Sequence, residues 1–106
     1  MINSFLKKWH KKRLLKQIYS LKVEAARLNS YALTSKLGAE ENKSYLAVRQ
    51  NLAAKGDDGS SIYLSCYLKD HLQKIQHFET EYATYNQKYL NTLDQIKHLE
   101  EELNKL

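Results

Sequence analysis

Residues 62–106 read IYLSCYLKDHLQKIQHFETEYATYNQKYLNTLDQIKHLEEELNKL. Large apolar side chains recur in this stretch at alternating intervals of three and four residues, which is the heptad spacing of a helix that buries one face. The positions with this spacing are Leu64, Leu68, His71, Ile75, Phe78, Tyr82, Tyr85, Tyr89, Thr92, Ile96, Leu99, Leu103 and Leu106. All of them except His71 and Thr92 are apolar or aromatic, so the pattern predicts one long helix of the coiled-coil type.

The first half of the chain carries a shorter pattern of the same kind. Its regular positions are Leu14, Ile18, Leu21, Ala25, Leu28 and Ala32, and after a gap over residues 35–42 the spacing resumes one residue out of phase at Tyr45, Val48 and Leu52. Either Gly38 ends a first helix, which would give three helices in all, or one helix runs from about residue 4 to 55 and is kinked or slips in phase. We favour the continuous helix because its length nearly matches that of the stretch that returns after the loop.

The segment Gly56-Asp57-Asp58-Gly59-Ser60-Ser61 separates the two patterns and predicts a loop over residues 56–61. Gly56 suits the position that follows a helix, and Ser60 or Ser61 suits the N-cap of a second helix over about residues 62–106. We therefore expect an all-α chain, a single domain over residues 1–106 that forms a long antiparallel helical hairpin. Off-pattern leucines at 72, 90 and 93 widen the apolar face and favour assembly into a four-helix bundle.

The composition excludes several classes of protein. The 106 residues include no Pro and three Gly, whereas a β-sandwich or barrel needs a turn about every 8–12 residues. No apolar stretch approaches the roughly 18 residues that a membrane-spanning helix requires. Cys66 is the single cysteine, which favours a cytoplasmic protein over a small secreted one, and residues 1–23 hold no apolar segment of the kind found in signal peptides.

No arrangement of residues in the sequence indicates an enzyme, a metal site or a cofactor. The histidines include no pair at the i, i+3 or i, i+4 spacing that places two imidazoles on one helix face; they are His10, His71, His77 and His98. Gly56 and Gly59 lie among acidic residues that would repel a phosphate. A lone cysteine such as Cys66 is more often a small side chain than a nucleophile. We interpret His71 as a polar residue that fixes the pairing of helices.

The net charge of +5 is concentrated at one end of the chain. Residues 1–23 contain seven bases and no acid: Lys7, Lys8, Lys11, Lys12, Arg13, Lys16 and Lys22. The remaining residues contain ten bases and twelve acids, among them Glu100-Glu101-Glu102. Such an asymmetry predicts an anionic partner, or head-to-tail contact between copies of the chain.

An amphipathic stripe occupies the same basic segment. Ile2, Phe5, Leu6 and Trp9 follow the i, i+3, i+4, i+7 spacing, and they lie more than about 100° around the helix axis from the regular positions that begin at Leu14. Trp9 either closes the end of the protein's own bundle or belongs to a contact surface. The candidate contact residues for an anionic partner or a membrane surface are Phe5, Leu6, Lys7, Lys8, Trp9, Lys11, Lys12 and Arg13.

These features favour a non-enzymatic helical module that binds other proteins by docking one helix face. The candidate partner-binding residues are Leu68, Ile75, Phe78, Tyr82, Tyr85, Tyr89, Ile96, Leu99 and Leu103. The expected partners are a second copy, giving a homodimer, or another helical protein, in an adaptor, chaperone or secretion-accessory role. Two alternatives stay open: nucleic-acid binding through the basic N-terminal helix, and peripheral association of residues 2–19 with an anionic membrane surface.

The general pattern resembles several groups of small bacterial helical hairpins. These are the export factors and helical chaperones of type III secretion, the WXG-type secreted hairpins and the bacteriocin immunity bundles. The loop reads Gly56-Asp57-Asp58-Gly59 where the WXG-type hairpins carry their signature, and the single tryptophan is Trp9, so no motif selects one group. The resemblance implies a shared helical shape and, for the last group, an immunity-type function.

Overall fold

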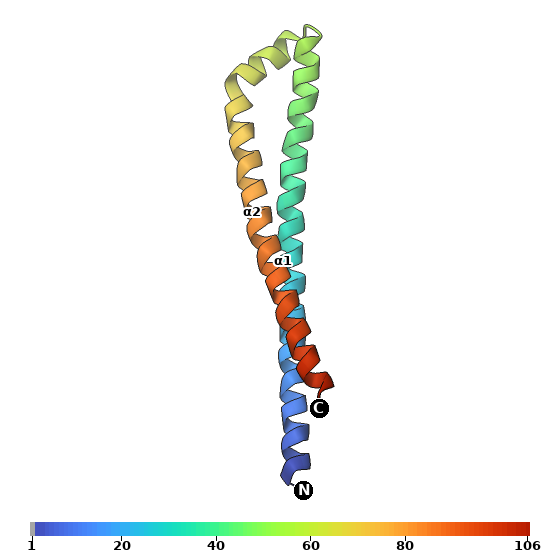
Figure 1. Ribbon diagram of the computed structural model, residues 1–106. Coiled ribbons are helices and arrows are strands. Elements are labelled where there is room, and N and C mark those ends of the chain that lie inside the picture. Colours follow the sequence, from blue (N-terminus) through green and yellow to red (C-terminus); the bar gives the residue numbers. More distant parts are fainter. Residues whose placement is uncertain (1) are drawn as a thin grey trace. The chain divides into compact units, whose positions relative to one another are not determined.

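The computed structural model describes residues 2–106, and over this range the chain is helical, with no strand. Helix α1 spans Ile2–Ala54 and helix α2 spans Asp58–Asn104, and the loop between them is three residues long (Figure 1). This confirms the prediction of an all-α chain built from two long helices. The single methionine lies outside the described residues.

The contacts between the helices gather in two compact units. Unit 1 combines the chain up to Ser30 with Tyr85–Leu106, and unit 2 is Tyr31–Thr84. In unit 2, Ser35 is hydrogen-bonded to Glu81, and Asn42 is hydrogen-bonded to His71. Residue numbers rise along α1 from the first pair to the second and fall along α2, so the two helix segments are antiparallel. Unit 1 likewise combines the first part of α1 with the last part of α2.

The buried face of α1 follows one unbroken heptad pattern. Its buried or half-buried positions with this spacing are Leu14, Ile18, Leu21, Ala25, Leu28, Ala32, Ser35, Ala39, Asn42, Leu46, Arg49 and Ala53. The predicted alternative of a break near Gly38, with three helices, is therefore wrong, because α1 continues through residues 35–42. The predicted slip in phase is also wrong: the exposed fractions of Tyr45, Val48 and Leu52 are 41%, 57% and 39%.

The core of unit 1 is small and lies between the two helices. Ile18 and Ala25 of α1 meet Ile96 of α2. Partly buried side chains that pack against these three are Leu21, Tyr89, Leu99 and Leu103. Both helices therefore contribute large side chains to this unit: Leu14, Ile18 and Leu28 are buried on α1, and Ile96 is buried on α2.

In unit 2, small residues of α1 make room for large residues of α2. A Cβ atom placed on Gly38 would lie 2.9 Å from Cε1 of Phe78, so this ring occupies the space that a side chain would take. Ala32 and Ala39, on the same part of α1, are almost completely buried. The close approach of backbone to ring explains why a glycine stands inside a helix, where it costs about 1 kcal/mol relative to alanine.

The loop is shorter than predicted because its acidic residues cap the second helix. Gly56 has a φ angle of 95°, and its N–H donates to the carbonyl of Ala53 while the N–H of Asp57 donates to that of Leu52. These two bonds form a Schellman motif, which confirms the predicted place of Gly56 after the helix. The predicted loop over residues 56–61 and the predicted cap at Ser60 or Ser61 are wrong. A carboxylate oxygen of Asp57 accepts the N–H of Ser60 at 3.1 Å, so the helix begins at Asp58.

We expect Asp57→Ala to lower the free energy of unfolding by about 1 kcal/mol, the usual effect of losing an N-cap carboxylate. The substitution removes the acceptor for the backbone N–H of Ser60 and for its hydroxyl, and Ser60 is fully buried. Thermal unfolding followed by far-UV circular dichroism measures the change. Asp70→Ala is the matched control, since Asp70 is exposed on α2 and should alter stability by less than about 0.5 kcal/mol. Equal effects of the two substitutions would contradict the capping role.

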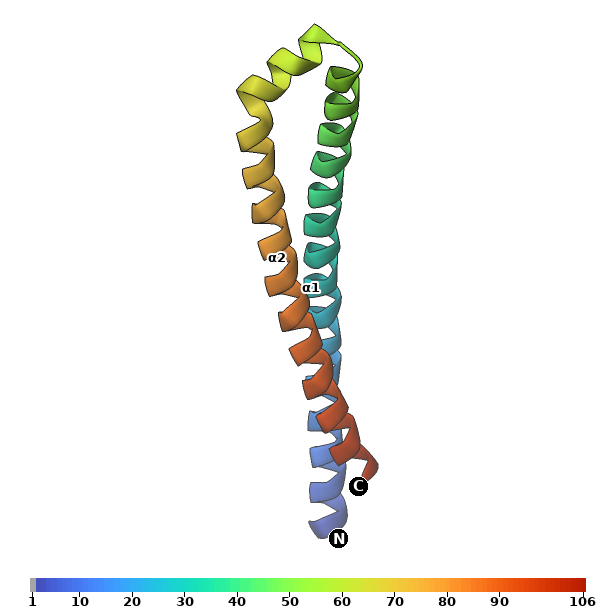
Figure 2. The ribbon, with the colours of Figure 1, turned by 45° about the horizontal axis from the view of Figure 1, so that its top comes forward.

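The first turns of α2 leave the loop at an angle to α1, and the helix then bends within unit 2 (Figure 2). Two turns into α2, the hydroxyl of Ser65 donates to the carbonyl of Ser61 at 3.1 Å. Serine bonds of this i−4 type compete with the helix ladder and often bend helices. The bend gives room for large side chains between the helices near the loop.

Candidate functional site

The residues predicted to bind a partner face the other helix of the same chain. All nine are buried or half-buried: Leu68, Ile75, Phe78, Tyr82, Tyr85, Tyr89, Ile96, Leu99 and Leu103. Ile96 and Leu99, for example, belong to the core of unit 1, and Phe78 lies against Gly38 in unit 2. These side chains therefore contribute to the packing of the hairpin itself.

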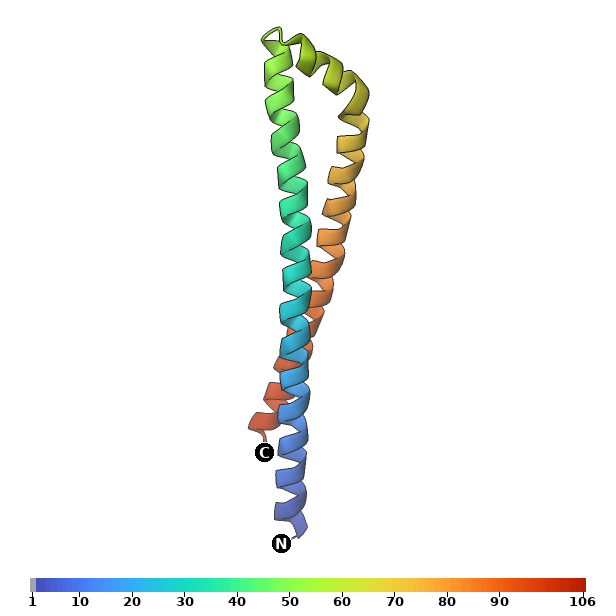
Figure 3. The ribbon, with the colours of Figure 1, turned by 180° about the vertical axis from the view of Figure 1, so that it is seen from behind.

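The stripe at the start of α1 is a group of exposed apolar side chains in unit 1. The exposed fractions are 76% for Ile2, 69% for Phe5, 52% for Leu6 and 54% for Trp9. The last residues of α2 lie beside Ser4 and Lys7, on another side of the helix, and the first turns of α1 extend past the end of α2 (Figure 3). Trp9 therefore does not close the protein's own core. We call Ile2, Phe5, Leu6, Trp9 and the bases beside them the N-terminal surface.

The bases of the N-terminal surface have no carboxylate partner within residues 2–106. The ion pairs of the described chain involve other cations, such as Arg27 with Glu24 and Lys43 with Glu79. The unpaired bases are Lys7, Lys8, Lys11, Lys12, Arg13 and Lys16, of which Lys7, Lys8 and Lys11 lie beside Leu103 and Leu106. The guanidinium of Arg13 lies 5.6 Å from the centre of the Trp9 ring, in cation–π range. The surface thus joins apolar side chains to unneutralised positive charge.

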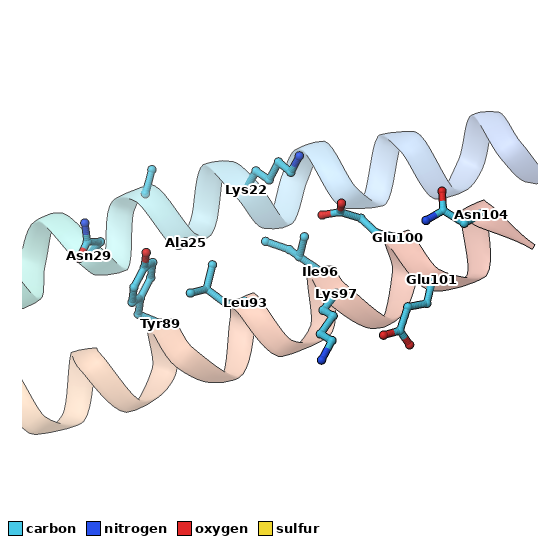
Figure 4. Close-up of a pocket in the computed structure, with 11 residues that line it drawn as sticks. Lys22, Ala25, Asn29, Tyr89, Leu93, Ile96, Lys97, Glu100, Glu101 and Asn104 are labelled. Carbon is cyan, nitrogen blue, oxygen red and sulfur yellow. The ribbon is translucent and has the colours of Figure 1, made fainter.

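A groove of about 640 Å³ runs along one side of unit 1 between the two helices. We call it the unit 1 groove. It is lined by Lys22, Ala25, Ala26, Asn29, Tyr89, Leu93, Ile96, Lys97, Glu100, Glu101 and Asn104. Figure 4 shows Tyr89, Leu93 and Ile96 pointing from α2 towards α1, whereas Lys97 and Glu101 point away from α1. The groove is apolar along its floor and carries charges of both signs.

A cluster of polar and aromatic side chains fills the space between the helices in unit 2 near the loop. Arg49 of α1 donates to the hydroxyl of Tyr45 at 3.0 and 3.2 Å, and its guanidinium lies 4.8 Å from the centre of the Tyr63 ring. The hydroxyl of Tyr63 lies 2.5 Å from Nε2 of His71, and the ring of His71 stacks on Tyr45. Nδ1 of His71 contacts Oδ1 of Asn42 at 3.0 Å. Five side chains from two helices thus form one network.

The network shifts the pKa values of its two tyrosines in opposite directions. The hydrogen bond from Arg49 holds the pKa of Tyr45 below its usual value, because a positive donor stabilises the phenolate, and the contact with Tyr63 acts in the same direction. Removal from water raises the pKa of Tyr63, and the hydrogen bond with Tyr45 raises it further. The hydrogen bond with Tyr45 in turn raises the pKa of Arg49.

Two members of this network, Tyr45 and His71, occupy regular positions of the predicted patterns. His71 is predicted to lie on the buried face of the second helix, where a polar residue fixes the pairing, and the contact with Asn42 supplies such a pairing. Asn42 and Arg49 were missed because neither is apolar. Their positions could have indicated them, because a heptad spacing continued without a break from Ala32 places both Asn42 and Arg49 on the buried face.

Within residues 2–106, no group of three or more His, Cys, Asp or Glu side chains could hold a metal ion. In that range there is also no helical stretch with the length and hydropathy needed to cross a bilayer. The thiol of Cys66 is free and exposed. Comparison of the chain with protein-family models, with curated proteins and with solved structures found no match.

Proposed function

We propose that the chain is a non-enzymatic helical protein–protein interaction module whose partner is a second copy, bound at the unit 1 groove. One observation carries the proposal: the groove joins exposed apolar side chains to charges of both signs. A surface of this composition is complementary to itself, as the two-fold interface of a homodimer requires. Two such units joined at this face would form a four-helix bundle.

Exposed apolar side chains continue the groove along both helices. Leu90 and Leu93 are exposed on α2, and Leu93 lines the groove. On α1, Leu15 and Tyr19 are exposed and precede Lys22 by seven and three residues, an interval that returns to the same side of a helix. Full burial of one large apolar side chain contributes about 1.5–3 kcal/mol, so four of them supply a sufficient driving force for association.

The charges of the groove favour one orientation of the two copies in the proposed dimer. Lys22 and Lys97 lie beside the apolar floor, and Glu100 and Glu101 lie nearer the end of α2. A two-fold axis that crosses α2 between these positions brings the glutamates of each copy towards the lysines of the other. Lys22, Lys97 and Glu100 form no ion pair within residues 2–106, which leaves them available for such contacts.

The position of Glu101 in its own helix also supports a role outside that helix. It lies in the last turn of α2, which ends at Asn104 and has no basic residue there. The free carbonyls at a helix C-terminus carry partial negative charge, so an acid in the last turn is unfavourable by about 0.3–1 kcal/mol. Attraction to a lysine across an interface would offset this cost.

We expect the wild-type chain to sediment as a dimer at micromolar concentration and the variant Glu100→Lys/Glu101→Lys to sediment as a monomer. In the variant, two new lysines would face Lys22 and Lys97 of the other copy, and like charges at an interface oppose association. Sedimentation velocity at several concentrations measures the change, and far-UV circular dichroism checks that the variant stays helical.

Two further variants sharpen this experiment. Lys22→Glu/Lys97→Glu should be monomeric alone and should form a heterodimer when mixed with Glu100→Lys/Glu101→Lys, because the swapped charges become complementary. Glu40→Lys/Glu41→Lys makes the same change of charge at exposed positions of unit 2 and should dimerise like the wild type. A monomeric wild type, or a dimer that survives the exchange of both glutamates, would contradict the proposal.

A further inference from the structure

We infer that the N-terminal surface, within residues 2–19, is a binding site for an anionic lipid surface. The inference is independent of the unit 1 groove, because the stripe lies in the first turns of α1 and none of its residues lines that groove. The side of α1 that faces α2 is occupied at this end by Leu103 and Leu106, which lie beside Lys7 and Lys11. The stripe itself is left without a covering element.

The side chains of the stripe are of the kind that enter a membrane interface. Ile2, Phe5 and Leu6 are large and apolar, and Trp9 combines an apolar ring with an N–H that hydrogen-bonds at the headgroup level. The spacing i, i+3, i+4, i+7 holds all four on one face of α1, so they can enter a lipid surface together while the helix lies in its plane.

The charge of the segment selects an anionic lipid surface. Six bases between residues 7 and 16 have no carboxylate partner in the described chain, and residues 2–23 contain no acid. Near an anionic membrane each lysine or arginine strengthens binding about fivefold. Lys12, Arg13 and Lys16 follow Trp9 by three, four and seven residues, intervals that return to the same side of a helix, so they would reach lipid phosphates when the stripe is inserted.

The apolar stripe favours lipid over nucleic acid as the occupant. A nucleic-acid backbone would neutralise the bases, and a base could stack on Trp9, but Ile2 and Leu6 would gain nothing from phosphate or from stacking. A lipid surface can bind both kinds of side chain in the N-terminal surface. The aliphatic side chains would enter the boundary of its acyl chains, and the cations would lie among its headgroups.

Binding to vesicles tests the inference, and Trp9 supplies the signal because it is the single tryptophan. We expect its emission to shift to shorter wavelengths with vesicles of phosphatidylcholine and phosphatidylserine, and to stay unchanged with phosphatidylcholine alone. The protein should also sediment with the anionic vesicles, and added salt should release it, because salt screens the attraction between lysines and headgroups.

Two pairs of matched variants separate the apolar and the charged contributions. Ile2→Ser/Leu6→Ser should abolish the shift, whereas Leu33→Ser/Leu37→Ser, which alters two other exposed aliphatic side chains of α1 four residues apart, should bind like the wild type. Lys8→Gln/Lys12→Gln should weaken binding about 25-fold. Lys55→Gln/Lys69→Gln, at exposed positions away from the N-terminal surface, should weaken it less than about twofold.

Three outcomes would overturn the inference. They are a wild type that binds no anionic vesicle, equal binding to neutral and anionic vesicles, and equal binding by Ile2→Ser/Leu6→Ser and the wild type. Binding to a single-stranded DNA oligonucleotide by both of these proteins, without binding to vesicles, would assign the surface to nucleic acid instead. The Glu100→Lys/Glu101→Lys variant keeps every residue of the N-terminal surface, so loss of its dimer leaves the vesicle test intact.

Discussion

Replacing Ile96 by alanine is expected to lower the free energy of unfolding by about 2–5 kcal/mol. Its side chain is 6% exposed and lies between Ile18 and Ala25 at the centre of the unit 1 core. The truncation removes contacts with these residues and leaves a cavity among them, and both effects lower stability. A small domain has only about 5–15 kcal/mol of stability, and the loss is therefore a large share.

Chemical denaturation followed by far-UV circular dichroism measures this change. The matched control is Ile62→Ala in the same helix, since Ile62 is 65% exposed and should alter stability by less than about 0.5 kcal/mol. If the two substitutions lower the midpoint equally, Ile96 is not part of a packed core. If Ile96→Ala has no effect at all, the antiparallel contact of the helices in unit 1 is itself in doubt.

Replacing Gly38 by leucine should destabilise the chain by about 1–3 kcal/mol, because the new side chain must displace the ring of Phe78. A Cβ atom alone would come within 3.0 Å of three carbons of that ring. Removal of a glycine from a helix interior returns about 1 kcal/mol at most, which is less than the upper end of the steric cost. The same denaturation experiment measures the difference.

A compensating substitution distinguishes steric conflict from a general loss of structure. Gly38→Leu/Phe78→Ala exchanges a small and a large side chain across the same contact, so the leucine can occupy part of the space that the ring leaves. We expect the double variant to be at least about 1 kcal/mol more stable than the sum of the two single effects. Additive effects would show that Gly38 and Phe78 do not share this space.

The second helix could be predicted from the sequence because its buried positions are large and apolar. Between Leu64 and Leu103, nearly every heptad position carries a leucine, isoleucine or aromatic residue, and the structure buries or half-buries each of them. The first helix follows the same geometry, but Ser35, Ala39 and Asn42 occupy the middle of its buried face. Hydrophobicity alone does not find such positions, since their burial is set by the large residues opposite.

The predicted slip in phase at Tyr45 is wrong for the same reason, because hydrophobicity alone does not identify the buried positions there. Tyr45, Val48 and Leu52 are the most apolar residues of their stretch, yet Leu46, Arg49 and Ala53 turn towards α2. Arg49 is accepted on the buried face because Tyr45 and Tyr63 surround its guanidinium. This network depends on residues from two helices meeting near the loop, and a pattern along one helix does not contain that information.

Of the candidate contact surfaces, one could be predicted from a single helix and the other could not. Exposure of the stripe from Ile2 to Trp9 followed from its angle to the face that begins at Leu14, a property of one helix, and the structure has the stripe exposed. The unit 1 groove needs both helices, since Lys22 comes from α1 and Glu100 from α2. The charge asymmetry of the sequence indicated contacts between copies, but the lining of a groove depends on how the helices pack.

The unequal sizes of the facing side chains also decide which helices of two chains are compatible. Two α2 segments placed face to face would bring Phe78 against rings of similar size, and two α1 segments would leave the space around Gly38 and Ala39 empty. In unit 2 the segment of each helix therefore pairs better with the other helix than with a second copy of itself, as in a heterotypic coiled coil. An exchange of α2 between two chains, with the loop opened, keeps this pairing, so domain-swapped and closed hairpins obey the same rule.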